Sequence, residues 1–139
     1  MGMPYEIIPF VVGMFVIVLS LDNSGVTSYL AELIGKSEPC YSYGISSMVS
    51  SNLLNNIPMS VLFSRILSQG ATEQAIYATI AGSNIGAFLT PVGALAGIMW
   101  SNIIKQNGVR MSVGKFVLYG VCIGVPTMFS LLFVIMHTV

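Results

Sequence analysis

Long apolar segments separated by short polar turns make up most of this sequence. The first runs from residue 4 to 21 and ends at Asp22-Asn23-Ser24-Gly25. Eighteen helical residues cover about 27 Å, enough for the hydrocarbon core of a bilayer. A short amphipathic stretch, 26–34, follows and is expected to lie at the interface. The last segment, 113–136, predicts a second plain span.

The segment 39–67 is apolar but interrupted. It contains Ser51-Asn52-Leu53-Leu54-Asn55-Asn56-Ile57-Pro58 within a charge-free stretch. Proline at 58 cannot donate a hydrogen bond to the carbonyl of Leu54, so the helix is expected to break near the asparagines. The segment could cross the membrane as a broken helix, or enter and return as a re-entrant hairpin with the asparagines at its tip. The distribution of basic residues mildly favours crossing.

The segment 73–104 is too long for one straight span. The charge-free part alone would reach roughly 46 Å as a helix, whereas a bilayer core is about 30 Å thick. Its glycines and Pro91 predict a discontinuous helix with an unwound middle. Gly82 and Gly86 suit the end of the first half. Thr90 as N-cap with Pro91 at the first helical position predicts where the second half starts.

Composition places these segments in a membrane. Only 7% of the residues are charged and 55% are hydrophobic, and the mean hydropathy is +0.85. The fold class is therefore expected to be an all-α membrane protein. A net charge of zero argues against a nucleic-acid partner. No basic region or cleavage site marks a signal peptide, so the first apolar segment is expected to be a retained span.

The positions of the basic residues predict an orientation in the cell membrane. The loop 105–115 carries Lys105, Arg110 and Lys115. Cytoplasmic loops are enriched in such residues, so this loop should face the cytoplasm and the C-terminus the outside.

The two interrupted segments carry the candidate chemistry. Helix breaks at membrane depth persist only when they are buried in protein or line a polar cavity, and paired breaks indicate a transporter's substrate site. The second half-helix was expected to point the N–H groups of residues 92–94 at an anion or polar oxygen. Carbonyls around Ser83 and Asn84 suit Na⁺ or a proton-bearing partner. The candidate substrate- or ion-binding residues are Ser51, Asn52, Asn55, Asn56, Ser83, Asn84, Gly86, Thr90 and Gly93, and the structural breaks are Pro58, Gly82 and Pro91.

Charged groups are absent from both breaks in the sequence. A neutral polyhydroxylated solute or a weakly charged anion should therefore bind more easily than a multivalent ion. Asp22, near a span end, is interpreted as a helix-ending surface residue rather than a coupling-ion ligand. The isolated Cys40 and Cys122 indicate packing, so no metal or cofactor is expected. Without a Ser/His/Asp or Cys/His grouping or a nucleotide-binding motif, an enzyme is not expected.

Helix packing is the competing interpretation of the polar and small residues. Polar side chains in membrane helices often only pair one helix with another. Gly93-xxx-Gly97 and Gly120-xxx-Gly124 have the spacing of small-residue packing motifs. Two breaks that combine Asn with Gly and Pro nevertheless favour a permeation site.

The segments 51–58, 82–86 and Leu89-Thr90-Pro91-Val92-Gly93-Ala94-Leu95-Ala96, followed by Met99-Trp100, resemble the C-terminal half of the arsenical pump membrane protein family. That family belongs to the ion transporter superfamily, with citrate and dicarboxylate carriers. The resemblance implies an Asn-tipped re-entrant hairpin at 52–58 and a discontinuous helix at 83–93, together half of a midplane site in an inverted repeat. Only one such hairpin and one broken helix are present here, so a missing N-terminal half or a second chain is expected as partner.

Three functions follow as hypotheses. The first is a secondary transporter segment for arsenite or antimonite efflux, driven by proton exchange or the membrane potential. The second keeps the fold but carries citrate or a dicarboxylate, or exchanges Na⁺ for H⁺. The third is a truncated membrane subunit or remnant that transports nothing by itself.

Overall fold

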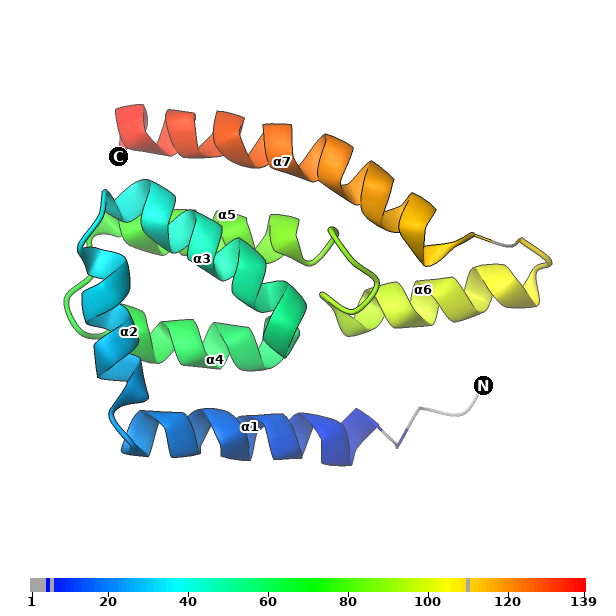
Figure 1. Cartoon of the computed structure of the whole chain (residues 1–139), viewed down its shortest axis with the longest axis horizontal. Coiled ribbons are helices and arrows are strands. Elements are labelled where there is room, and N and C mark those ends of the chain that lie inside the picture. Colours follow the sequence, from blue (N-terminus) through cyan, green and yellow to red (C-terminus); the bar gives the residue numbers. More distant parts are fainter. Residues whose placement is uncertain (1–4, 6, 110) are drawn as a thin grey trace.

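The computed structural model describes residues 5, 7–109 and 111–139, and over these residues it contains seven helices and no strand. Most of the helix axes run roughly along one direction, α2 crosses one end, and α6 extends beyond the ends of α4 and α5 (Figure 1). Their bounds are α1 Ile7–Asn23, α2 Val26–Gly35, α3 Pro39–Leu54, α4 Asn56–Leu67, α5 Glu73–Gly86, α6 Leu95–Gln106 and α7 Val113–Thr138.

The close pairing of α3 with α5 forms the centre of the fold. A Cβ at Gly82 would collide with the carbonyl oxygen of Gly44, and one at Gly86 with the hydroxyl of Ser51. Small residues therefore line both sides of this contact and let the two backbones approach. In a membrane, such close van der Waals packing is what holds helices together, because lipid supplies no hydrophobic drive between them.

Two apolar clusters flank this central pair. One joins α1, α3, α4 and α5 through residues that include Val18, Tyr43 and Leu62. The other joins α3 and α5 to α7 through residues that include Met128 and Leu132. The α3–α5 pair is thus held between the α1–α4 side and α7.

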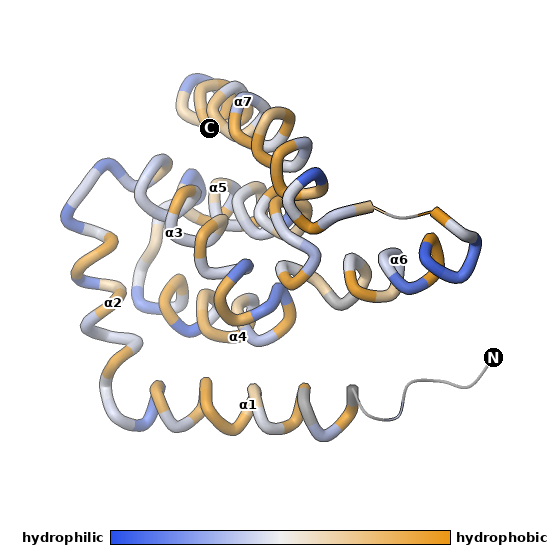
Figure 2. Tube along the Cα trace, turned by 45° about the vertical axis from the view of Figure 1, so that its right-hand side comes forward, coloured by the Kyte–Doolittle hydropathy of each residue, from blue (hydrophilic) through white to orange (hydrophobic). Residues whose placement is uncertain are grey.

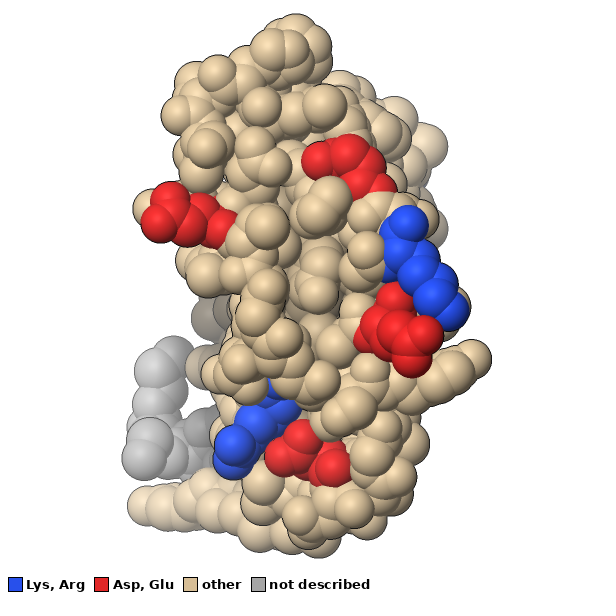
Figure 3. Space-filling model, turned by 90° about the vertical axis from the view of Figure 1, so that its left-hand side faces the viewer, with Lys and Arg blue, Asp and Glu red and all other residues tan. Residues whose placement is uncertain are grey.

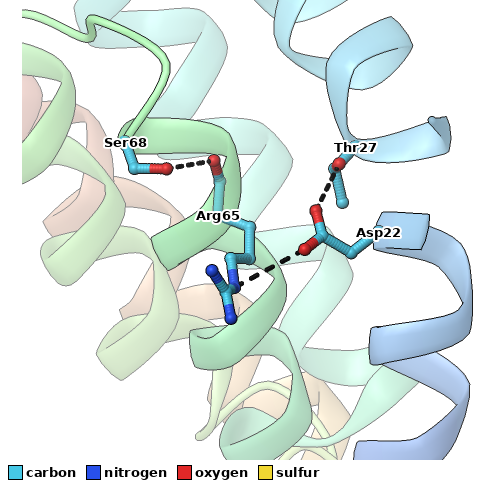
Figure 4. Close-up of polar contacts among 4 residues, drawn as sticks. All are labelled: Asp22, Thr27, Arg65 and Ser68. Carbon is cyan, nitrogen blue, oxygen red and sulfur yellow. Dashed lines mark hydrogen bonds and ion pairs between the residues drawn. The ribbon is translucent and has the colours of Figure 1, made fainter.

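A polar contact ties the corner between α1 and α2 to α4 (Figure 4). Asp22 Oδ1 accepts a hydrogen bond of 2.7 Å from Thr27 Oγ1. Its Oδ2 lies 3.6 Å from Arg65 Nε. The expectation that Asp22 ends a helix at the surface agrees with this position, and Arg65 is an ion-pair partner rather than a free cation.

Charged side chains gather at the two ends of the molecule. The end formed by α2, the loop before α3 and the loop between α4 and α5 shows acidic and basic groups together (Figure 3). It includes the pairs Lys36–Glu32 and Arg65–Asp22. Lys105 and Lys115 belong to the opposite end, where α6 leads into α7. Between the ends, α1 and α7 are largely hydrophobic (Figure 2) and expose apolar side chains such as Val12, Val16 and Phe133.

Helix length and composition give a limited set of membrane spans. Of the described residues, α7 alone is a single helix long and apolar enough to cross a bilayer. The pair 11–23 and 26–35 passes the same test together, but is bent by 76°. The shorter helices α3 to α6 are the products of the two breaks, so each is too short to be a span by itself.

The expected break in 39–67 falls at Asn55, between α3 and α4. Because α4 turns back and packs against α3, the outer ends of both helices lie at the charged end (Figure 1). The expected end of the first half-helix at Gly86 is confirmed. The predicted start of the second half is wrong, because α6 begins at Leu95 rather than at Pro91.

Candidate functional site

The two breaks meet. The tip of the α3–α4 hairpin lies beside the loop 87–94 that follows α5 (Figure 1). The tip carries Asn52, Asn55 and Asn56, and each of them is hydrogen-bonded to Gly86 or to the loop. We call this meeting point the asparagine junction, made of Asn52, Asn55, Asn56 and the loop 87–94.

Asn52 bridges helix α3 to the end of α5 and to the middle of the loop. Its Nδ2 donates to the carbonyl of Met48 at 2.9 Å and to the carbonyl of Gly86 at 3.0 Å. Its Oδ1 accepts a hydrogen bond of 2.8 Å from Thr90 Oγ1. A Cβ at Gly93 would lie only 3.0 Å from that Oδ1. One side chain therefore pairs the last carbonyl of α5 with the polar turn beyond it.

Asn55 sits at the hairpin tip in a conformation that side chains rarely adopt. Its φ is 68° and its ψ is 153°, a region occupied almost only by glycine. The residue is 5% exposed, and its Nδ2 donates to the carbonyl of Val92 at 3.2 Å. The neighbouring backbone N–H of Asn56 donates to the carbonyl of Gly93 at 3.0 Å. A strained residue is thus held in place by bonds to the other break.

Thr90 shapes a turn instead of capping a helix. The N–H of Gly93 donates to the carbonyl of Thr90 at 3.1 Å and to its hydroxyl oxygen at 3.2 Å. Proline at 91 suits the second position of such a turn, where its fixed φ is already correct. The turn delays α6 to Leu95, so the expected free N–H of Gly93 is already bonded and cannot serve an anion.

The remaining candidate residues divide into packing and peripheral positions. Ser51 is fully buried, and its hydroxyl donates to the carbonyl of Met48 in its own helix. Ser83 likewise donates to Ile80. Asn84 is exposed and its amide also donates to Ile80, so the structure does not bring it to the junction. Pro58 lies in the first turn of α4, where a missing N–H costs little.

Gly82 and Gly86 have a role that the sequence reasoning missed. Gly82 was predicted as a structural break but lies inside α5, and Gly86 is the last residue of that helix; both allow its contact with α3. Their spacing of four residues was the available signal, since it matches a small-residue packing motif. The partners Gly44 and Ser47 on α3 were not among the candidates either.

The junction is neutral and most of its donors are already used. None of the hydrogen bonds that join the hairpin tip to Gly86 and the loop 87–94 involves a charged side chain. The amides of Asn52 and Asn55 donate to backbone carbonyls, whereas Asn56 Oδ1 is buried without a partner among the described residues. Such an atom is costly to leave unpaired. The free capacity of the junction is therefore that of an acceptor, suited to a solute that brings its own hydroxyl groups or to a small cation.

Comparison with known proteins gives one consistent result. The model of a family described as arsenical pump membrane protein matches residues 1–137. The chain is similar to the arsenical pump membrane proteins of Yersinia enterocolitica and of Escherichia coli K12, each 29% identical over 140 residues. These alignments cover 92% of this chain and 32% of either relative. A relative from Bacillus subtilis strain 168 is 34% identical over 125 residues, 82% of this chain and 28% of its own length.

The chain therefore spans about a third of the length of these relatives. No solved structure matches it.

Proposed function

The chain belongs to the arsenical pump membrane protein family, and we propose from this that it forms one part of a transporter that exports arsenite or antimonite. The chemistry of the asparagine junction supports this substrate class. Arsenous acid is uncharged at neutral pH and carries hydroxyl groups. A junction of amides, hydroxyls and carbonyls can hydrogen-bond such a solute without a counter-charge.

The observation that carries the proposal is the direct bonding between the two breaks. Asn52 and Asn55 each join the hairpin to the loop 87–94. Unwound backbone in a membrane is tolerated only where protein or water satisfies its polar groups. In this family member, the same polar groups would define the midplane solute site of an ion-transporter-type fold.

We place the α3–α4 hairpin as a re-entrant element. Both of its outer ends lie at the charged end formed by α2 and the α4–α5 loop (Figures 1 and 3). The tip then reaches the membrane interior from one side only. With the loop 105–115 in the cytoplasm, that charged end and the C-terminus face outward.

The rest of the site is proposed to come from another part of the transporter. The relatives are about three times as long as the aligned region, and an inverted repeat would supply a second hairpin and a second broken helix. Coupling to H⁺ or Na⁺, or to the membrane potential, would then involve that second half, because the junction here contains no carboxylate. We propose no enzymatic activity for this segment.

Transport by a chimera tests the proposal. The matching third of the Escherichia coli relative is replaced by this chain, and arsenite accumulation is measured in everted membrane vesicles. Asn52→Leu and Asn55→Leu should abolish accumulation. Asn107→Leu is the matched control, because the side chain of that exposed asparagine, which follows the last residue of α6, donates only to the carbonyl of Ile103. Full transport by both junction variants would contradict the assignment of the site.

A carboxylate carrier is the second candidate function. The observation that favours it is the start of α6, where Ala94 provides no side-chain cap, because uncapped N–H groups at a helix N-terminus attract anions. Competition in the same vesicles separates the two candidates. Citrate or succinate should leave arsenite accumulation unchanged if the first proposal holds, and should inhibit it if carboxylates share the site.

A further inference from the structure

A groove lined by hydroxyl groups lies between α4 and α5, on the flank of the hairpin. Its volume is about 370 Å³, within the range of small-molecule sites. Five hydroxyl-bearing residues line it, together with four apolar side chains. The hydroxyl residues are Ser60, Ser64, Ser68, Thr79 and Ser83. None of them except Ser83 was singled out by the sequence analysis.

The serines of α4 form a continuous row. They are spaced by four residues, so they lie on one face of the helix. Ser60 is one turn from the hairpin tip, and Ser68 is at the outer end of α4. The row therefore extends from the asparagine junction toward the charged end. The same three serines also border a hollow that includes Arg65.

Thr79 provides an independent sign that the groove binds something. It lies on α5, is only 6% exposed and lines the groove. Its Oγ1 has no hydrogen-bond partner among the described residues. A buried hydroxyl without a partner is unfavourable, and valine would fill the same volume without that cost. Because this oxygen is buried as well as unpaired, a solute completes its bonding only by entering between α4 and α5.

The bonding pattern indicates the chemical class of that ligand. Ser60 donates to the carbonyl of Asn56 at 2.7 Å, and Ser68 donates to that of Arg65 at 2.8 Å. Ser83 donates to the carbonyl of Ile80 at 3.0 Å. With their protons engaged, these hydroxyls offer lone pairs to the groove. The hydroxyls of Ser64 and Thr79 make no such bond among the described residues, so they can donate as well as accept. A neutral polyhydroxylated solute can pair with both kinds of group, whereas a carboxylate only accepts and would face the lone pairs of the other three serines.

We propose that this hydroxyl-lined groove is an outer solute site, through which a small neutral polyhydroxylated solute such as arsenous acid passes between the asparagine junction and the charged end. The inference rests on the proposed function, since it assigns a route to the same substrate. It adds a binding position on α4 and α5 that is distinct from the junction. Thr79 contacts the solute, and Ser64 lies midway along the row.

Kinetics of the chimeric transporter test the binding role. Thr79→Val is expected to raise the KM for arsenite about threefold to tenfold, the effect of one lost hydrogen bond, while leaving the protein at least as heat-stable. Thr127→Val is the matched control. Its hydroxyl already donates to Ile123, and the residue lines a different, largely apolar cavity between α5, α6 and α7, so the KM of this variant should not change. An unchanged KM for Thr79→Val in an active chimera overturns this inference and leaves the proposed function standing.

Water accessibility provides a second readout that does not depend on transport. Ser64→Cys, with every other cysteine replaced, should react with a membrane-impermeant thiol reagent applied from the outside. A cysteine at Ile123, in the apolar cavity, should not react. If Ser64→Cys is unreactive, the groove is filled by protein or lipid and the inference fails. If the unmodified chimera does not transport arsenite although Ser64→Cys reacts, the proposed substrate fails, and with it the assignment of this groove to arsenous acid.

Discussion

Replacing Asn55 with glycine or alanine separates backbone strain from side-chain bonding at the hairpin tip. Its backbone, at φ 68° and ψ 153°, costs a non-glycine residue about 1–3 kcal/mol. The hydrogen bond from its Nδ2 to Val92 contributes about 0.5–1.5 kcal/mol. Asn55→Gly loses the bond and gains unfolded-state entropy of about 0.5–1 kcal/mol relative to alanine, but it relieves the strain.

These contributions nearly cancel for glycine, whereas alanine loses the hydrogen bond and keeps the backbone strain that Asn55 already has. Asn55→Gly should therefore leave the free energy of unfolding within about 1 kcal/mol of the original, and Asn55→Ala should be less stable than Asn55→Gly by about 1 kcal/mol. For a chain of 139 residues, that difference corresponds to at least about 2 °C in Tm. Thermal unfolding in detergent measures it.

Transport should respond differently from stability. Both variants lack the amide that joins the hairpin to Val92, so arsenite accumulation in vesicles should fall for glycine as well as for alanine. The reasoning is refuted if alanine is as stable as glycine, because the strain would then not exist. It is equally refuted at the level of function if Asn55→Gly transports normally.

Three further predictions concern contacts between helices. Gly86→Ala should destabilise the protein by about 1–3 kcal/mol, because its Cβ would collide with α3. Gly114→Ala, which meets no atom within 4 Å, should not destabilise it in the same thermal assay. Asp22→Asn should cost no more than about 1 kcal/mol, since its ion pair with α4 is partly exposed, and a larger or salt-independent loss would contradict this estimate. Phe116→Ala should change the fluorescence of Trp100, the sole tryptophan, because the rings lie 5.5 Å apart; an unchanged spectrum would mean that α6 does not contact α7 there.

The positions of the breaks could be predicted from local chemistry. Proline at 58 and the neighbouring asparagines made a continuous helix unfavourable, and the structure breaks it at Asn55. Gly86 likewise ends α5 as expected. The predicted start of α6 was wrong because Thr90-Pro91 suits the beginning of a turn as well as the beginning of a helix. The hydroxyl of Thr90 donates a hydrogen bond to Asn52, a residue 38 positions away in the chain, and the local sequence does not reveal that bond.

The roles of the site residues were harder to predict than their neighbourhood. Ser51 and Asn52 are adjacent, yet one packs against Gly86 and the other bridges two breaks. Which role each plays depends on the rotation of α3 about its axis relative to α5. Asn84 has the amide side chain expected of a site residue, but its position on α5 is exposed and lies away from the junction.

By itself, the sequence determined that this chain is a set of apolar helices with two polar interruptions. Composition and backbone chemistry act locally, so residue order is enough to place such breaks. Only the tertiary structure decided that the interruptions meet, that Gly82 and Gly86 serve the α3–α5 contact, and that a row of serines faces Thr79 across a groove. Those facts arise from contacts between residues far apart in the chain, and they depend on how closely and at what angle the helices pack.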